Sequence, residues 1–284
     1  LSIVAEPTFL YVSKFTRYLS PENGLTYLFF MFASFGVLIK LVAINRLTQL
    51  KWLSIIVYCS TYFLLHEFTQ IRAGIASGLL LLSIIPIAER NITKFIIIIA
   101  GASLFHYSAI VAFPLYFIGN RVIDRKTLII LAASIPLGAA IHFTQFDILV
   151  ALPIKAAQLK LETYYAVEQL RNLKLNVFNS LYLIRYALLY VLLFFAYRIQ
   201  KENPYFPILL KIYTISLFSY LVLSKNAVLA MRISELYGVV EIILVPLLYY
   251  TIRPRSIPVT LIFIFSIVSF GINIYWTELV RDVF

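Results

Sequence analysis

Three polar side chains of different chemistry lie close together between two apolar stretches. They are Glu67, Gln70 and Arg72. An arginine fixed at a helix end can bind a phosphate through two parallel hydrogen bonds and keeps its charge where water is scarce. The same residues also fit a solvated turn whose arginine extends to a membrane interface. Gly74 and Gly78 favour the packed alternative, because a G-x-x-x-G pair lets two helices approach closely.

His106 is the second candidate, followed directly by Tyr107. A lone histidine is more often a hydrogen-bonded structural residue than a catalyst, but it can donate to a phosphate or act as a general base. His66, His106 and His142 lack the i, i+3 or i, i+4 spacing of helical metal ligands. We therefore expect no metal site and no cofactor, and we retain His106 as a catalytic candidate with Tyr107 beside it.

A third group of charged residues follows one expected helix late in the chain. Arg232 begins this helix, Glu235 follows one turn later, and Glu241 falls near its middle. A carboxylate at that depth of a membrane is costly unless it is paired. We expect Arg185, on the neighbouring span, to be the partner of Glu241 in a structural ion pair, while Arg185 is also a candidate for binding substrate.

The loop before this helix adds Lys225 and Asn226. Together with Arg72 and Arg232, they predict a cationic patch suited to a diphosphate or another anion. Two other cations, Lys40 and Lys211, are expected near the cytoplasmic ends of their helices. We interpret these two lysines as extending to the membrane interface.

The composition indicates that a membrane surrounds the helices that carry these groups. Of the 284 residues, 62% are hydrophobic and 13% are charged, with a mean hydropathy of +0.91. A water-soluble domain is roughly half apolar and about a quarter charged. The net charge of +11 is spread between apolar stretches rather than gathered on one face, so it gives no support to a nucleic-acid partner. A single cysteine, Cys59, excludes a disulfide framework.

Apolar runs long enough to cross a bilayer as helices set the expected architecture. The stretch 92–119 is too long for one helix and too short for two ordinary ones. If it enters and returns as a broken hairpin, most arginines and lysines of the short loops fall on one face, as the positive-inside rule requires for the cytoplasmic side. With this hairpin the sequence predicts an all-α polytopic protein of about 8–10 transmembrane helices. The clear spans are expected at 26–45, 52–66, 70–88, 127–143, 180–197, 205–224, 232–250 and 257–277.

This topology gathers most of the polar candidates on the extracytoplasmic side. The same side receives 144–179, a long polar connection with interspersed leucines, which we interpret as interfacial amphipathic helices. The stretch 7–19 has the same character. We interpret 1–284 as a single integral membrane domain, and since the chain begins at Leu1 we expect an upstream segment, an N-terminal transmembrane helix, to be missing.

The order of these features resembles the EpsG family of bacterial exopolysaccharide proteins, which are grouped with the Wzy-type O-antigen and capsule polymerases. The resemblance covers most of the chain. It depends on Glu6-Pro7 before an amphipathic stretch, on the segment FTQIRAGIA at 68–76, on SLFHYSA at 103–109, and on Arg232 after a short polar loop. Ala73 departs from the pattern, in which a second polar residue is expected.

The resemblance implies a membrane glycosyltransferase of the GT-C-like kind that needs no metal. It would join polyprenyl-diphosphate-linked oligosaccharide repeat units on the outer face of the bacterial cytoplasmic membrane. Arg72 and Arg232, with Lys225 in support, would stabilise the diphosphate leaving group. His106, or else Glu67 or Glu235, would accept the proton of the acceptor hydroxyl. Membrane lipid, a chain-length regulator and a flippase are the implied partners.

Three other classes of protein remain open from the sequence. A membrane O-acyltransferase acting on polysaccharide would depend on His106 as its base and tolerate loss of Arg72 or Arg232. A flippase or transporter of lipid-linked sugars would carry polar residues through the depth of several spans. A structural membrane subunit would tolerate Arg72→Ala as long as it folds.

Overall fold

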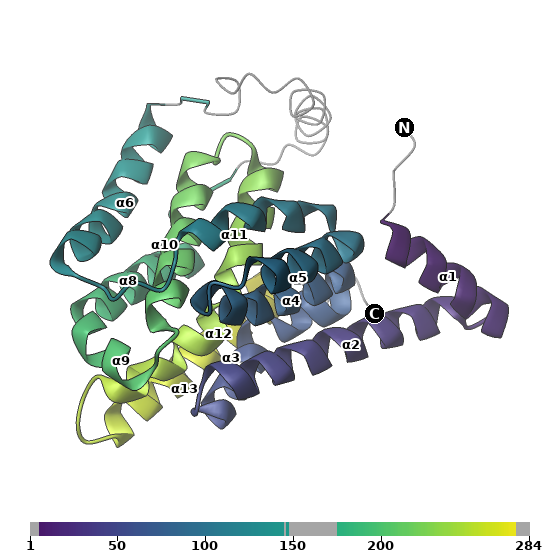
Figure 1. Cartoon of the computed structure of the whole chain (residues 1–284), viewed down its shortest axis with the longest axis horizontal. Coiled ribbons are helices and arrows are strands. Elements are labelled where there is room, and N and C mark those ends of the chain that lie inside the picture. Colours follow the sequence, from purple (N-terminus) through teal and green to yellow (C-terminus); the bar gives the residue numbers. More distant parts are fainter. Residues whose placement is uncertain (1–5, 145, 148–174, 277–284) are drawn as a thin grey trace.

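The computed structural model describes residues 6–144, 146–147 and 175–276, and the elements formed by these residues are all helical (Figure 1). The first half contains α1 (Pro7–Leu19), α2 (Gly24–Leu47), α3 (Lys51–Thr61), the π-helix η1 (Leu64–Thr69), α4 (Ile71–Ala88), α5 (Ile92–Phe105), the 3-10 helix η2 (Tyr107–Phe117) and α6 (Arg125–Phe143). The second half contains α8 (Ser180–Phe194), α9 (Ala196–Glu202), α10 (Phe206–Val222), α11 (Ala227–Gly238), α12 (Glu241–Leu244), the 3-10 helix η3 (Pro246–Tyr250), α13 (Ser256–Gly271) and the π-helix η4 (Ile272–Trp276).

The helices confirm an all-α, multi-pass membrane protein. Among the described residues, α2, α4, α6 and the segment Ser256–Ile274 are each long and apolar enough to cross a bilayer. The pair α8 and α9, bent by 77°, forms a fifth candidate span. The other expected spans are present as shorter apolar helices or as helices broken into pieces, so the predicted number of 8–10 depends on counting these as well.

The hairpin predicted for 92–119 is confirmed. Helix α5 ends at Phe105, the backbone is extended at His106, and the chain then returns as η2. The two ends of the hairpin meet, since the Arg90 guanidinium donates to the Tyr116 carbonyl at 3.3 Å and the Tyr116 hydroxyl donates to the Arg90 carbonyl at 2.9 Å. Gly119 closes this end with a positive φ of 63°, and the Arg90 guanidinium occupies the space that a side chain at Gly119 would need. His106 therefore lies at the far tip of the hairpin.

Small residues on α4 permit the close packing that the sequence predicts. A Cβ at Gly74 would lie 2.7 Å from the His66 carbonyl oxygen, and a Cβ at Gly78 would lie 2.9 Å from Cγ2 of Ile39. Helix α2 and the π-helix η1 can therefore lie directly against α4. This packing holds η1 rigidly beside the first turn of α4.

The expectation that Lys40 reaches the membrane interface is wrong. Its side chain is fully buried between α2 and α4, where Nζ contacts Oε1 of Glu67 at 2.6 Å and the Gly74 carbonyl at 2.7 Å. A buried ammonium needs such partners, and no local pattern indicates that Glu67 faces inward. Lys211 is half-buried and donates to the carbonyls of Gly119 and Arg121, both at 3.2 Å.

The two expected interfacial stretches differ in how far they can be compared with the structure. The helix expected for 7–19 is confirmed by α1, which exposes Tyr11, Phe15 and Tyr18 and packs against α2 and α5. Most of the stretch 144–179 lies outside the described residues. In Figure 1, α1 and α6 lie at opposite sides of the central helices.

Candidate functional site

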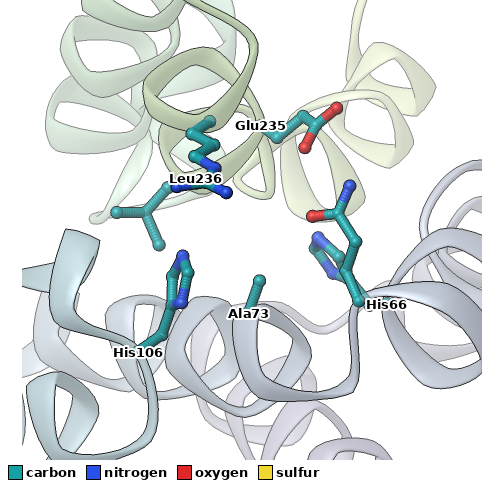
Figure 2. A pocket seen from close by; sticks show the side chains of 7 residues that line it. His66, Ala73, His106, Glu235 and Leu236 are labelled. Atoms are coloured by element: carbon teal, nitrogen blue, oxygen red, sulfur yellow. The ribbon is translucent and has the colours of Figure 1, made fainter. Parts of the chain in front are cut away.

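A small polar pocket lies where η1 and α4, the hairpin tip and α11 meet. Figure 2 shows Glu235 and Leu236 facing His66, Ala73 and His106 across it. Its volume is about 10 Å³, which is room for about one water molecule. The residues that line the pocket are His66, Gln70, Ala73, His106, Arg232, Glu235 and Leu236.

The π-helix η1 positions two of these residues. His66 lies within η1, and Gln70 is the residue that joins η1 to α4. The His66 ring packs on the Tyr62 ring, with centroids 5.1 Å apart, and its Nδ1 lies 3.2 Å from the Ser77 hydroxyl on α4. These contacts fix the imidazole at the wall of the pocket.

A carboxylate from the start of α1 links two of the predicted site residues. Glu6 forms an ion pair with the Arg72 guanidinium through one oxygen, and its other oxygen lies 3.3 Å from Nδ1 of His106. The Arg72 guanidinium also lies over the Phe9 ring, 5.1 Å from its centroid. Arg72 is therefore connected to His106 through Glu6 and does not line the pocket itself.

Helix α11 supplies the opposite wall. Asn226, which is fully buried, caps its first turn, with Oδ1 accepting from the Leu229 amide at 3.0 Å. Arg232 and Glu235, one turn apart on the same face, both reach the pocket. Lys225 is exposed in the preceding loop and does not line the pocket.

Two further candidates from the sequence lie elsewhere. Glu67 is adjacent in sequence to His66 but points away from the pocket, toward Lys40 and the Tyr58 hydroxyl, which donates to Oε1 at 2.8 Å. Tyr107 begins η2, is partly exposed and does not line the pocket. The structure thus brings together four of the predicted residues at the pocket: Gln70, His106, Arg232 and Glu235. Arg72 is linked to His106 through Glu6.

The expected pair of Arg185 and Glu241 is confirmed. Nη2 of Arg185 lies 3.2 Å from Oε2 of Glu241, and the other carboxylate oxygen accepts from the Tyr213 hydroxyl at 3.0 Å. Glu241 is fully buried, whereas Arg185 lines a second, much larger cavity of about 820 Å³. Gln70 and Glu235 line both spaces, so the two cavities adjoin.

Sequence reasoning did not identify His66 and Glu6 as parts of the site. His66 stands one helical turn before Gln70, a spacing that could have placed the two side chains on one face. Glu6 is distant in sequence from its partners and gave no such signal. Among the described residues, no group of three or more His, Cys, Asp and Glu side chains could hold a metal ion.

These features define an all-α, multi-pass membrane protein with a polar pocket formed by a broken hairpin, a π-helix and a late helix. The chain belongs to the EpsG family, whose model matches residues 2–281. It is also similar to the amylovoran biosynthesis protein AmsC of Erwinia amylovora, with 25% identity over 258 residues, which cover 86% of this chain. The chain spans only 65% of the length of that relative. No solved structure matches the chain significantly.

Proposed function

We propose that this protein is a polysaccharide polymerase that joins polyprenyl-diphosphate-linked oligosaccharide repeat units. The observation that carries the proposal is the convergence of Arg232, His106 and Glu235 on one pocket, from segments far apart in the sequence. Membership of the EpsG family supports it, as does the similarity to a protein named for the biosynthesis of amylovoran.

The chemistry of the leaving group explains the cationic side of the pocket. When the anomeric carbon–oxygen bond breaks, the electron pair stays with the diphosphate, and the negative charge grows in the transition state. Fixed cations and hydrogen-bond donors at that position lower the barrier. Arg232 lines the pocket and is exposed, so it can contact the diphosphate directly, and His106 is the second donor.

Arg72 acts through its neighbours in this proposal. Glu6 joins Arg72 to His106, so it fixes the imidazole and balances part of the local positive charge. The pocket has space for about one water molecule, which is less than a diphosphate needs. Substrate binding therefore requires side chains to move, and Arg232, the most exposed charged group of the pocket, is the first that we expect to do so.

The setting of the reaction is part of the same proposal. The hairpin tip and the start of α11 would face the outside of the bacterial cytoplasmic membrane, and the chain would act as a single membrane domain without a metal or other cofactor. The lipid-linked oligosaccharide and membrane lipid would be its immediate partners. A flippase that delivers the substrate and a chain-length regulator would work beside it.

The test uses the full chain reconstituted in nanodiscs with a polyprenyl-diphosphate-linked repeat unit from its source cells. Products are resolved by size for the wild type, Arg232→Ala, His106→Ala and Arg72→Ala. Arg46→Ala, an exposed arginine in the last turn of α2, is the matched control. We expect a ladder from the wild type and the control, and a rate lower by roughly 10²–10³ in Arg232→Ala.

Other outcomes would contradict the proposal. A folded wild-type protein that makes no ladder from authentic substrate is not a polymerase. An enzyme that loses activity in His106→Ala but keeps it in both arginine variants fits acyl transfer, because a histidine base is then the critical group. Activity that survives in Arg232→Ala at the wild-type rate would remove Arg232 from the leaving-group site.

A further inference from the structure

The large cavity beside the polar pocket has the size of a ligand site. Its volume is about 820 Å³, within the range of roughly 300–1,000 Å³ of small-molecule sites. Segments from α3, η1, the start of α8, α10, α11 and η4 form its walls. The cavity therefore lies at the junction of both halves of the chain.

The charges around this cavity do not favour an anionic ligand. Arg185 lines it, but its guanidinium is paired with the fully buried Glu241 at 3.2 Å. The Arg185 side chain is nine-tenths buried, and its Nε has no hydrogen-bond partner among the described residues. Glu235 is the other charged residue of the lining. An anion such as a diphosphate would therefore bind weakly in this cavity. It would bind better in the small pocket, which Arg232 and His106 line.

The remaining polar lining consists of groups that bind hydroxyls. Asn176 and Gln70 contribute amide groups, and an amide can donate and accept at the same time. Apolar side chains, including Phe178 and Leu181, stand between these amides. A wall that combines hydrogen-bonding groups with apolar side chains is complementary to a sugar. The hydroxyls of a sugar point outward from the ring, and its C–H groups form apolar faces.

One wall of the cavity is held rigid. The rings of Tyr182 and Tyr220 are stacked, with centroids 3.4 Å apart and planes within 3°. The Tyr182 hydroxyl bonds to the Ser234 hydroxyl at 3.0 Å, and the Tyr220 hydroxyl accepts from the Asn179 amide at 3.2 Å. Because the hydroxyls of these tyrosines are already hydrogen-bonded, the side chains of this wall lose little conformational entropy when a ligand binds.

Glu235 connects the two spaces. With Gln70 it lines both the small pocket and the large cavity, and it lies near Arg185 on one side and Arg232 on the other. A bond formed between a group in the large cavity and one in the small pocket would be made beside this carboxylate. Figure 2 shows Glu235 on the side of the pocket opposite His66 and His106.

We propose that the large cavity binds the sugar part of the acceptor, which is itself a lipid-linked repeat unit, and that Glu235 takes the proton from its attacking hydroxyl. This inference rests on the proposed polymerase function and adds to it the position of the second substrate. The acceptor oxygen forms a bond to the anomeric carbon of the donor as the bond from that carbon to the phosphate oxygen breaks. The leaving electron pair goes to the diphosphate, and the hydroxyl proton goes to the Glu235 carboxylate.

The ligand of the cavity can be captured without knowing its structure. Leu181 lines the cavity, whereas Leu183 on the same helix is exposed on the outside at 50%. A benzophenone amino acid is placed at one or the other position in the full chain, expressed in the source cells and irradiated. We expect adducts at Leu181 to contain sugar by mass spectrometry, and adducts at Leu183 to contain lipid without glycan.

An adduct at Leu181 that lacks sugar, or sugar labelling no greater than at Leu183, would overturn the acceptor site. The result does not depend on turnover, because capture needs binding alone. If the probe at Leu181 captures sugar but the wild-type protein makes no polymer, the polymerase is refuted and the glycan site stands. If the wild-type protein makes polymer but the probe at Leu181 captures no sugar, only the assignment of the cavity is refuted.

The role of Glu235 is tested by kinetics with the lipid-linked substrate. We expect Glu235→Gln to lower kcat by roughly 10²–10⁴ while KM changes little, because the amide fills the same space but cannot take a proton. Glu235→Asp keeps the carboxylate and should retain part of the rate. A variant Glu235→Gln with wild-type kcat, or one whose loss lies entirely in KM, would overturn the assignment.

Discussion

The buried pair of Lys40 and Glu67 yields a prediction about stability rather than catalysis. Both side chains are shielded from solvent, with exposed fractions of 0% and 1%, and Nζ lies 2.6 Å from the carboxylate. Lys40→Met removes the bond to Glu67 and the bond to the Gly74 carbonyl. Among the described residues, the Tyr58 hydroxyl then remains as the hydrogen-bond donor to the carboxylate, at 2.8 Å.

The magnitude follows from the loss of two charge-assisted bonds and the isolation of one charge. Hydrogen bonds to charged groups contribute about 1.5–3 kcal/mol each. Removing one member of a buried ion pair costs about 3–5 kcal/mol. We therefore expect Lys40→Met to lower the free energy of unfolding by about 3–5 kcal/mol. Adding Glu67→Gln removes the isolated charge and should recover more than half of that loss.

The assay is reversible unfolding in mixed detergent micelles, followed by circular dichroism, for the wild type, both single variants and the double variant. Polymer formation is measured on the same preparations. A loss below about 1 kcal/mol in Lys40→Met, or a double variant as unstable as the sum of the two single variants, would refute the reasoning. A stable double variant without activity would place Glu67 in the chemistry after all.

Three further predictions concern local packing and capping. Gly74→Ala should lower the free energy of unfolding by about 1–3 kcal/mol in the same assay, because its Cβ would meet the His66 carbonyl at 2.7 Å; Gly101→Ala, where nothing lies within 4 Å, should not destabilise, and equal losses would contradict the account. Asn179→Ala should cost about 1 kcal/mol through the lost cap of the Tyr182 amide, and no change would show that the cap contributes nothing. The hydrogen bonds from Thr127 lower the pKa of the exposed Asp124 carboxyl, so its stabilising contribution is present above the unfolded pKa of about 3.9 and is lost as the pH falls through the lower folded value; in Asp124→Asn this part of the acid dependence of unfolding should disappear, and an unchanged dependence would refute it.

The fold was largely accessible from the sequence because membrane helices carry strong local signals. Apolar length located the helices, and the distribution of arginine and lysine identified the hairpin at 92–119, which the contacts between Arg90 and Tyr116 confirm. The pair of Arg185 and Glu241 followed from the cost of an unpaired carboxylate at membrane depth. In both cases the free-energy cost of placing a charged group inside the membrane excluded most other arrangements of the chain.

The details of the site were less accessible because they depend on which way a helix face turns. The predicted position of Lys40 was wrong, because an apolar helix gives little indication of which of its faces contacts protein and which contacts lipid. His66 and Glu67 are neighbours in sequence, yet one lines the pocket and the other joins the core. The contact of Glu6 with Arg72 and His106 joins segments far apart in the chain and follows from no local pattern.

The most direct test of the polymerase counts two products of one reaction. The reconstituted wild-type chain is given lipid-linked repeat units, and both the released polyprenyl diphosphate and the new glycosidic bonds are quantified over time. We expect one diphosphate to be released for each bond formed, with both rates falling together in Arg232→Ala. Diphosphate release without bond formation, or neither product from authentic substrate and folded protein, would contradict it.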